Sequence, residues 1–183
     1  MKDLSLHILD LSQNSISAGA SLVEISVEED TKADRLTICI NDNGKGMDKD
    51  FLVKVMDPFV TTRTSRKVGL GIPLMQAACR RCEGDLVIES EKNVGTQLTA
   101  VFKHSHIDRA PMGNMAETML SLILAGSDVN RVVDFVYRHI VDGRDFCLDT
   151  REIRTALGND VNLGEPEVLM WIKDYINEGL KNI

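Results

Sequence analysis

The sequence predicts an α+β fold, a two-layer sandwich in which helices cover one face of a mainly antiparallel sheet. Two pairs of alternating apolar and polar segments, 21–30 with 35–42 and 85–91 with 96–104, indicate two hairpins. Segments with helical periodicity lie before and between them. With 183 residues, 43% of them hydrophobic and 27% charged, the chain is long and apolar enough for one compact domain with its own core.

The first three elements follow from their periodicities. Residues 4–19 carry apolar side chains near the helical period, and the pattern stops at Ala18 and Gly19. Residues 21–30 alternate as a strand with one buried face does, and residues 35–42 repeat this after a polar turn. We therefore expect a helix followed by two antiparallel strands.

The next elements surround a long polar segment. After the second strand, DNGKGMD contains two glycines within three residues, and a short helix is expected over roughly 48–55. The segment 57–71 is polar and basic, and a loop of this length is usually functional or mobile. A helix over 70–84 tolerates Pro73 in its first turn and ends at Gly84.

The remaining residues predict a smaller α/β part. A connector leads to a helix over 116–126 and to a hairpin with strands at 131–141 and 144–150 that turns at Asp142 and Gly143. Two helices follow, one capped by Thr150 and stopped by Gly158, the other starting at Pro166 and ended by Gly179. This tail is either a second small unit or an extension packed on the first. We expect domains at 1–105 and 106–183, the second serving for partner docking or dimerisation.

Charge and hydropathy exclude several classes. The net charge of −7 argues against a nucleic-acid or anionic-membrane surface. No apolar run approaches the ~20 residues that span a bilayer, and the charged start MKDLSLHILD does not fit a signal peptide. We therefore expect a cytoplasmic protein whose four cysteines are reduced.

Three groups of residues point to chemistry. Asp10 and Asn14 lie one helical turn apart, facing either solvent or a bound ion. Asp42 ends a strand beside glycines and can accept a hydrogen bond from an exocyclic amine, although an Asn-Gly surface turn also fits. Basic side chains and glycines precede the helix at 70, where backbone N–H groups bind phosphate; they are Arg63, Arg66, Lys67, Gly69 and Gly71.

Four motifs in order, DLSQNSISAGA, DNGKGM, TTRTSRKVGLGIPL and VGTQL, resemble those of the GHKL superfamily of ATP-binding domains. This superfamily includes gyrase-type topoisomerases, heat-shock chaperones, sensor histidine kinases and the mismatch-repair protein MutL. The resemblance covers about residues 4–103 and implies a Bergerat-type fold that binds ATP and Mg²⁺.

The resemblance also implies residue roles. Asp42 would bind the adenine amino group, Asn14 would ligate Mg²⁺, and Thr96 would help to hold adenine and its water. Asp10 stands at the position of the general base, which is usually Glu. Its side chain is one methylene shorter, so whether ATP is hydrolysed stays an open question. In the lid, Lys67 would contact the γ-phosphate and Phe59 would anchor the loop. The other expected nucleotide contacts are Gly44, Gly46, Met47, Thr61, Arg63, Val68, Gly69, Leu70 and Gly71.

Two alternative functions are expected. The first is a stand-alone protein kinase or phosphotransfer regulator that acts on an unidentified partner protein. The second is a nucleotide-dependent binding module with little or no turnover. A complete sensor histidine kinase would need an upstream phosphoacceptor domain, and a topoisomerase or MutL-type machine a larger following domain. The phosphate acceptor stays open, and a homodimer is possible because related small members dimerise.

Other potential ligands have simpler interpretations. Cys79 and Cys82 with His104 and His106 could bind zinc, but buried thiols near a helix end are the more frequent case. His7 is more often a helix-face histidine than part of a site.

Overall fold

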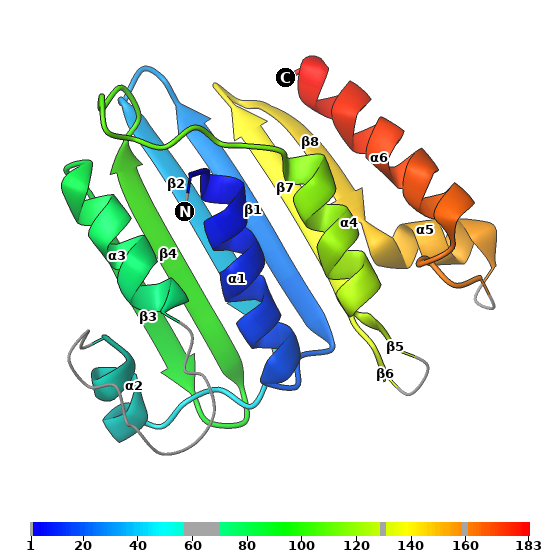
Figure 1. Ribbon diagram of the computed structural model, residues 1–183, viewed down its shortest axis with the longest axis horizontal. Coiled ribbons are helices and arrows are strands. Elements are labelled where there is room, and N and C mark those ends of the chain that lie inside the picture. Colours follow the sequence, from blue (N-terminus) through cyan, green and yellow to red (C-terminus); the bar gives the residue numbers. More distant parts are fainter. Residues whose placement is uncertain (1, 57–69, 129–130, 159–160) are drawn as a thin grey trace.

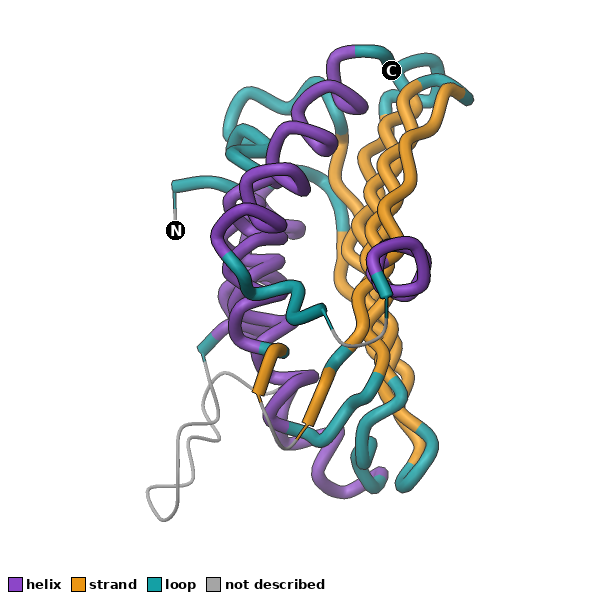
Figure 2. The backbone as a smooth tube through the Cα atoms, turned by 90° about the vertical axis from the view of Figure 1, so that its right-hand side faces the viewer, coloured by secondary structure: helices purple, strands orange, loops and turns teal. Residues whose placement is uncertain are grey.

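The computed structural model describes residues 2–56, 70–128, 131–158 and 161–183, and in these residues one six-stranded sheet forms the centre of the molecule. Its strand order is β3-β4-β2-β1-β7-β8. Helices α1, α3, α4 and α6 lie on one face of the sheet, as Figures 1 and 2 show. The strands of the sheet are β1 (Leu22–Asp30), β2 (Arg35–Asp42), β3 (Asp85–Glu91), β4 (Gly95–Lys103), β7 (Asp134–Val141) and β8 (Arg144–Asp149). The helices are α1 (Leu4–Ser17), α2 (Lys49–Met56), α3 (Gly71–Arg81), α4 (Met115–Ala125), α5 (Thr150–Leu157) and α6 (Pro166–Lys181).

Both predicted hairpins of the first half are confirmed. Strand β1 pairs antiparallel with β2, with Ile25 opposite Ile40, and β3 pairs antiparallel with β4. Strand β4 also pairs with β2, which brings the two hairpins into one sheet. Alternate residues of β1 and β2 are buried under the helices, as the period-2 pattern requires.

The C-terminal strands extend the same sheet. Strand β7 runs parallel to β1, from Leu22 opposite Asp134 to Glu29 opposite Val141, and β8 pairs antiparallel with β7. The mainly antiparallel α+β fold is thus confirmed, with β1 and β7 as one parallel pair inside the sheet. A single sheet contains strands from both predicted domains, 1–105 and 106–183. The division near residue 105 therefore stays a proposal, and it concerns function.

Helix α1 depends on the segment that follows the first half. Its first N–H groups, those of Leu4 and Ser5, donate to the carbonyls of Pro111 and Met112 at 2.9 and 2.8 Å. These carbonyls satisfy donors that the start of a helix leaves unpaired. Helices α1 and α4 contact each other, and both contribute fully or almost fully buried side chains to the core, including Leu4, Ile8, Met115, Met119 and Leu122.

Three boundary predictions were wrong. The expected strand 131–141 is divided into β6 (Arg131–Val132), which pairs with β5 (Ser127–Asp128), and β7. Asp149, not Thr150, caps α5: its carboxylate accepts the N–H of Arg151, while the buried Thr150 hydroxyl accepts the N–H of Phe135. Helix α6 continues past Gly179, where a Cβ would overlap the Phe146 ring, so this glycine permits close packing instead of ending the helix.

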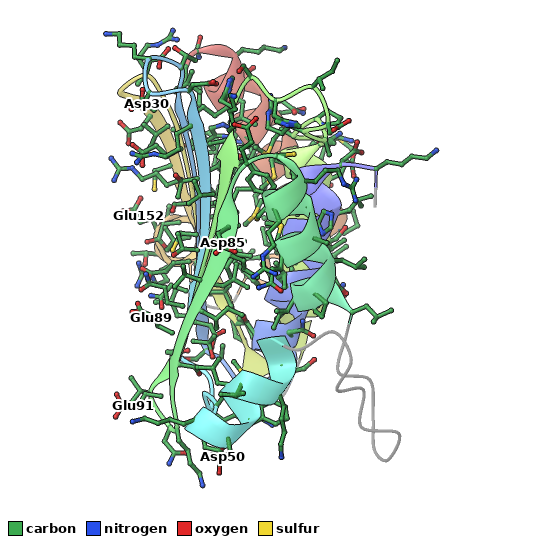
Figure 3. All side chains as sticks on the ribbon, turned by 90° about the vertical axis from the view of Figure 1, so that its left-hand side faces the viewer. Asp30, Asp50, Asp85, Glu89, Glu91 and Glu152 are labelled. Atoms are coloured by element: carbon green, nitrogen blue, oxygen red, sulfur yellow. The ribbon has the colours of Figure 1, made fainter. Side chains whose placement is uncertain are left out.

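The face of the sheet opposite the helices carries acidic side chains. Figure 3 shows Glu89, Glu91 and Glu152 on this side. Together with the net charge of −7 they make the surface unfavourable for polyanions. None of the described helices is both long and apolar enough to cross a membrane.

A partly buried hydrogen-bond cluster joins β1, β7 and the end of β4. The Glu29 carboxylate on β1 accepts hydrogen bonds from His139 Nε2 on β7 and from His104 Nε2, just after β4, each at 2.8 Å. On its other side, His139 Nδ1 lies 2.7 Å from the Tyr137 hydroxyl. The hydrogen bond from His139, and then that from His104, lower the pKa of Glu29 from 4.5 to about 2, although burial opposes them.

This cluster predicts a specific acid sensitivity. Because folding lowers the pKa of Glu29, its contribution to stability is complete above about pH 4.5 and is lost as pH falls from 4.5 towards 2. We expect Glu29→Gln to reduce the free energy of unfolding by about 1–3 kcal/mol at pH 6 and to flatten its decline below pH 4.5. Urea unfolding at several pH values measures both, with exposed Glu28→Gln on the same strand as control. An equally steep decline in Glu29→Gln would refute the assignment.

Candidate functional site

Asp42, the last residue of β2, is the buried carboxylate around which the site is built. It is 8% exposed and accepts two hydrogen bonds, from Ser15 Oγ at 2.6 Å and from the Gly44 backbone N–H at 2.9 Å. Ser15 belongs to α1, so this contact fixes the helix against the end of the strand. An ionised carboxylate only accepts hydrogen bonds, and Asp42 therefore offers its remaining lone pairs to a donor in the adjoining space.

The loop after Asp42 is held close to its neighbours. Asn43 Oδ1 accepts the N–H groups of Ser21 and Leu22, and the Lys45 N–H donates to the Ala18 carbonyl at 2.9 Å. Gly46 has φ +59°, and a Cβ there would overlap the Glu91 carbonyl oxygen. The second glycine of the motif is therefore required by both backbone conformation and space.

Thr96 lies beside Asp42 in the sheet. It is directly opposite Asp42 in the β2–β4 register, and its hydroxyl is 2.8 Å from Ser90 Oγ. Ser90 Oγ also accepts the Met47 N–H at 2.8 Å and donates to the Gly95 carbonyl at 3.0 Å. Ser90 thus connects the glycine loop to the turn between β3 and β4.

A cavity of about 580 Å³ lies beside Asp42, Gly46 and Thr96, between α1, the 42–47 loop, α2 and the sheet. Its lining is mostly apolar with a few polar groups, as is typical of a small-molecule site. The residues are Leu11, Asn14, Ser15, Ser17, Ala18, Ile40, Asp42, Lys45, Gly46, Met47, Phe51, Val55, Ile72, Thr96 and Leu98. The apolar side chains suit a flat ring, and Asp42 suits an amine on its edge.

The acid and the amide of α1 differ in their positions. Asn14 is exposed and lines the cavity. Asp10, one turn earlier, is half-buried and is not among the residues that line the cavity in the described part of the chain. It lies against Gly71, where a Cβ would overlap the Asp10 Oδ2 atom. Gly71 is the first residue of α3, so the Asp10 carboxylate lies against a helix N-terminus, where negative charge is favoured.

Part of the predicted site lies outside the described residues, namely Phe59, Thr61, Arg63, Lys67, Val68 and Gly69. At the near end of this segment, Leu70 is the N-cap of α3 and is 62% exposed. The structure brings together Asn14, Asp42, Gly44, Gly46, Met47 and Thr96 around one cavity.

Sequence reasoning missed several residues of the site. Ser15 and Ser90 are common polar residues whose partners come from distant segments, so no local pattern singles them out. Ile40 and Leu98 lie opposite each other on β2 and β4 and were visible as inward positions of strands, but not as cavity lining. Phe51, on the short helix α2, carried no signal beyond helical spacing.

Two of the cysteines, Cys79 and Cys82, are parts of the core, as is His7. Cys79 and Cys82 are buried, and burial raises the pKa of the Cys79 thiol to about 12, so it stays protonated. His7 is 4% exposed, and burial lowers its pKa.

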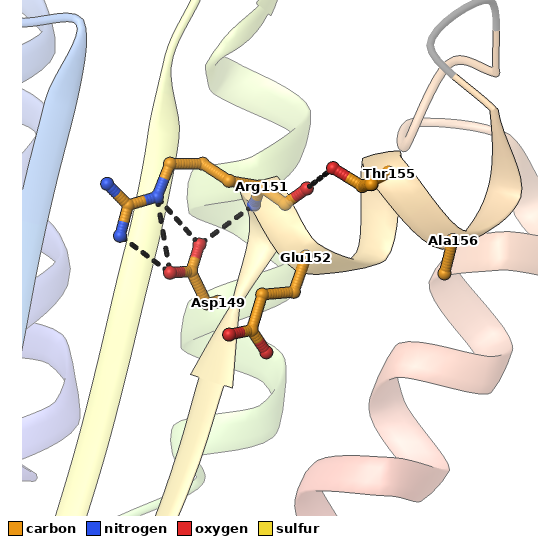
Figure 4. Close-up of a pocket in the computed structure, with 5 residues that line it drawn as sticks. All are labelled: Asp149, Arg151, Glu152, Thr155 and Ala156. Carbon is orange, nitrogen blue, oxygen red and sulfur yellow. Dashed lines mark hydrogen bonds and ion pairs between the residues drawn. The ribbon is translucent and has the colours of Figure 1, made fainter.

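A second hollow, of about 380 Å³, lies over α5. In Figure 4 the Arg151 guanidinium turns back onto Asp149, which it contacts through Nε and Nη2 at 2.6–3.2 Å. Since this cation is already paired, the hollow offers a ligand much less than the first cavity does.

A comparison with protein families decides the identity of the fold. Residues 2–106 match the model of the histidine kinase-, DNA gyrase B- and HSP90-like ATPases. The chain belongs to this family. It therefore contains a GHKL-type ATPase domain, and ATP binding is implied by membership.

Curated relatives place this domain near histidine kinases. It is 33% identical over 110 residues to the sensor protein kinase FleS of Pseudomonas aeruginosa, covering 60% of this chain and 27% of that protein. It is 32% identical over 102 residues to the signal transduction histidine-protein kinase AtoS of Escherichia coli, covering 55% and 16%. The aligned part is thus about a quarter or less of each relative's length.

Solved structures confirm the fold. The ATPase domain of Aquifex aeolicus MutL, complexed with ADP, aligns with a TM-score of 0.50 at 16% identity, covering 86% of this chain and 69% of that one. The N-terminal domain of a DNA repair protein aligns with a TM-score of 0.54 at 16% identity, covering 81% and 53%. At this identity the likeness concerns the Bergerat fold alone.

Proposed function

We propose that this protein binds ATP with Mg²⁺ and acts as a protein kinase or phosphotransfer regulator on a partner protein. The observation that carries the proposal is Asp42, a buried acceptor fixed by Ser15 and Gly44 at the edge of an apolar cavity. The exocyclic amine of adenine is the donor that this carboxylate would bind. Family membership supports ATP, and the identities to sensor kinases support a phosphotransfer role.

The metal and phosphate end of the site would lie along α1 and the start of α3. Asn14, exposed at the cavity, offers an amide oxygen, a ligand type that Mg²⁺ accepts. Mg²⁺ would neutralise phosphate charge when bound. Lys67, outside the described residues, is proposed as the γ-phosphate ligand on the basis of the resemblance.

Asp10 is proposed as the general base. Its carboxylate would take the proton of the attacking water or of the partner's acceptor group. It is one methylene shorter than the usual Glu, but its position against Gly71 directs it towards the start of α3. Positioning of this kind determines whether a base works.

The test of turnover is phosphate release from ATP and transfer of labelled phosphate. If Asp10 is the base, Asp10→Asn should lower the rate at least about 100-fold while ATP affinity changes little. Glu28→Gln, an exposed acid on β1, is the matched control and should keep the full rate. Measurable turnover that is equal in wild type and Asp10→Asn would exclude Asp10 as base.

The second candidate, a nucleotide-dependent binding module, is favoured by the outer face of α6. Met170, Trp171 and Tyr175 are 65%, 52% and 41% exposed, and the rings of Trp171 and Tyr175 stack with centroids 5.3 Å apart. Large exposed apolar side chains of this kind are frequent at protein interfaces. We propose that residues 106–183 bind the partner or a second copy. Negligible phosphate release from wild type that still binds ATP would favour this candidate over the kinase.

A further inference from the structure

Three polar side chains form one row across the sheet beneath the cavity. In the register, Asp42 on β2 lies opposite Thr96 on β4, and Thr96 lies opposite Ser90 on β3. Residues directly opposite each other in neighbouring strands project from the same face. Asp42 and Thr96 line the cavity, and Ser90 stands behind Thr96.

The hydroxyl proton of Ser90 determines which way the hydrogen bond between Ser90 and Thr96 runs. A serine hydroxyl has one proton and two acceptor lone pairs. Ser90 accepts the Met47 N–H and donates to the Gly95 carbonyl, which can only accept. Its contact of 2.8 Å with Thr96 is then satisfied only if the Thr96 hydroxyl donates to Ser90.

We infer that Ser90 is a positioning residue for base selection: it accepts the hydrogen bond of the Thr96 hydroxyl, so that Thr96 presents only acceptor lone pairs to the cavity. This inference rests on the proposed binding of ATP. The Asp42 carboxylate and the Thr96 hydroxyl then present only hydrogen-bond acceptors to this side of the cavity. An amine is favoured there, and an oxygen at the same ring position is repelled.

The consequence is a preference between two nucleotides of equal charge. Adenosine triphosphate carries a 6-amino group and an unprotonated N1, whereas inosine triphosphate carries a 6-oxygen and a proton on N1; the expected preference concerns the 6-position. Wild type should bind the adenosine form at least about tenfold more tightly. In Ser90→Ala the Thr96 hydroxyl is free to donate into the cavity, so this ratio should fall about three- to tenfold.

A double-mutant cycle with Thr96→Val tests the route of the effect, using calorimetric dissociation constants for both nucleotides with Mg²⁺ in the full chain. In the Thr96→Val background, Ser90→Ala should leave the ratio unchanged within about twofold. Ser90→Thr, which keeps a hydroxyl, should retain the wild-type ratio. Ser121→Ala, a hydroxyl deletion on α4, is the control for folding and general affinity.

Three results would overturn the inference. If Ser90→Ala weakens both nucleotides by the same factor, Ser90 only supports the Met47 loop. If it changes the ratio equally in both Thr96 backgrounds, it does not act through Thr96. If wild type binds neither nucleotide, the proposed function fails as well, whereas normal ATP binding with an unchanged ratio in Ser90→Ala refutes this inference alone.

Discussion

Replacing Asp42 by asparagine should weaken ATP binding at least about 100-fold, the effect of removing a charge-assisted hydrogen bond in a buried site. Asparagine keeps the size of the side chain, but an NH₂ group replaces one of the two oxygens. This group then faces Ser15 Oγ, the Gly44 N–H or the cavity. In each case the cavity loses an acceptor. Calorimetry with ATP and Mg²⁺ measures the change.

The control for this variant is Asp85→Asn on β3, an acid whose side chain is 63% exposed, pairs with Arg80 at the surface and accepts the Leu86 N–H. It should bind ATP as wild type does. Thermal unfolding of both variants distinguishes lost recognition from lost structure. ATP affinity within threefold of wild type in a folded Asp42→Asn would remove Asp42 from base recognition.

A chain that ends at residue 106, the limit of the family match, should fail to fold cooperatively. It would lack the Pro111 and Met112 carbonyls that accept the first N–H groups of α1, and α4, which covers that helix. It would also lack β7, leaving β1 as a sheet edge. Since α1 carries Asn14 and Ser15, ATP binding should be lost with the fold.

Circular dichroism during heating and calorimetry with ATP test this, with the full chain as reference. We expect no cooperative transition and strong aggregation of the fragment. The full chain carrying Trp171→Ala serves as a second control, because this side chain is exposed and its loss should leave the transition nearly unchanged. A fragment that unfolds at the temperature of the full chain would show that the first 106 residues form an independent unit.

Local patterns were sufficient to predict most of the elements, although not the short β5–β6 pair, because most depend on periodicity and punctuation within a few residues. The helix at 4–17 and the strands at 22–30 and 35–42 lie within a few residues of their predicted bounds. The parallel pairing of β7 with β1 could not be predicted in this way. It joins segments about 110 residues apart, and alternation identifies a strand without naming its neighbour.

The residues of the candidate site likewise fall into those that could be predicted from local sequence and those that could not. Asn14, Asp42 and Thr96 were identifiable since they belong to motifs with fixed order. Ser15 and Ser90 became visible only when distant segments met, because their role consists of contacts to Asp42, Met47 and Thr96. At Gly179 a rule of local punctuation predicted a helix end, but the close packing of Phe146 explains the glycine instead.

The central claim is that the cavity beside Asp42 binds ATP, and a calorimetric titration of the full chain with ATP and Mg²⁺ tests it most directly. The account predicts a saturable isotherm with one site per chain, and loss of that isotherm in Asp42→Asn. Absence of binding by the folded wild-type chain at millimolar ATP would contradict it, as would an isotherm that Asp42→Asn leaves unchanged.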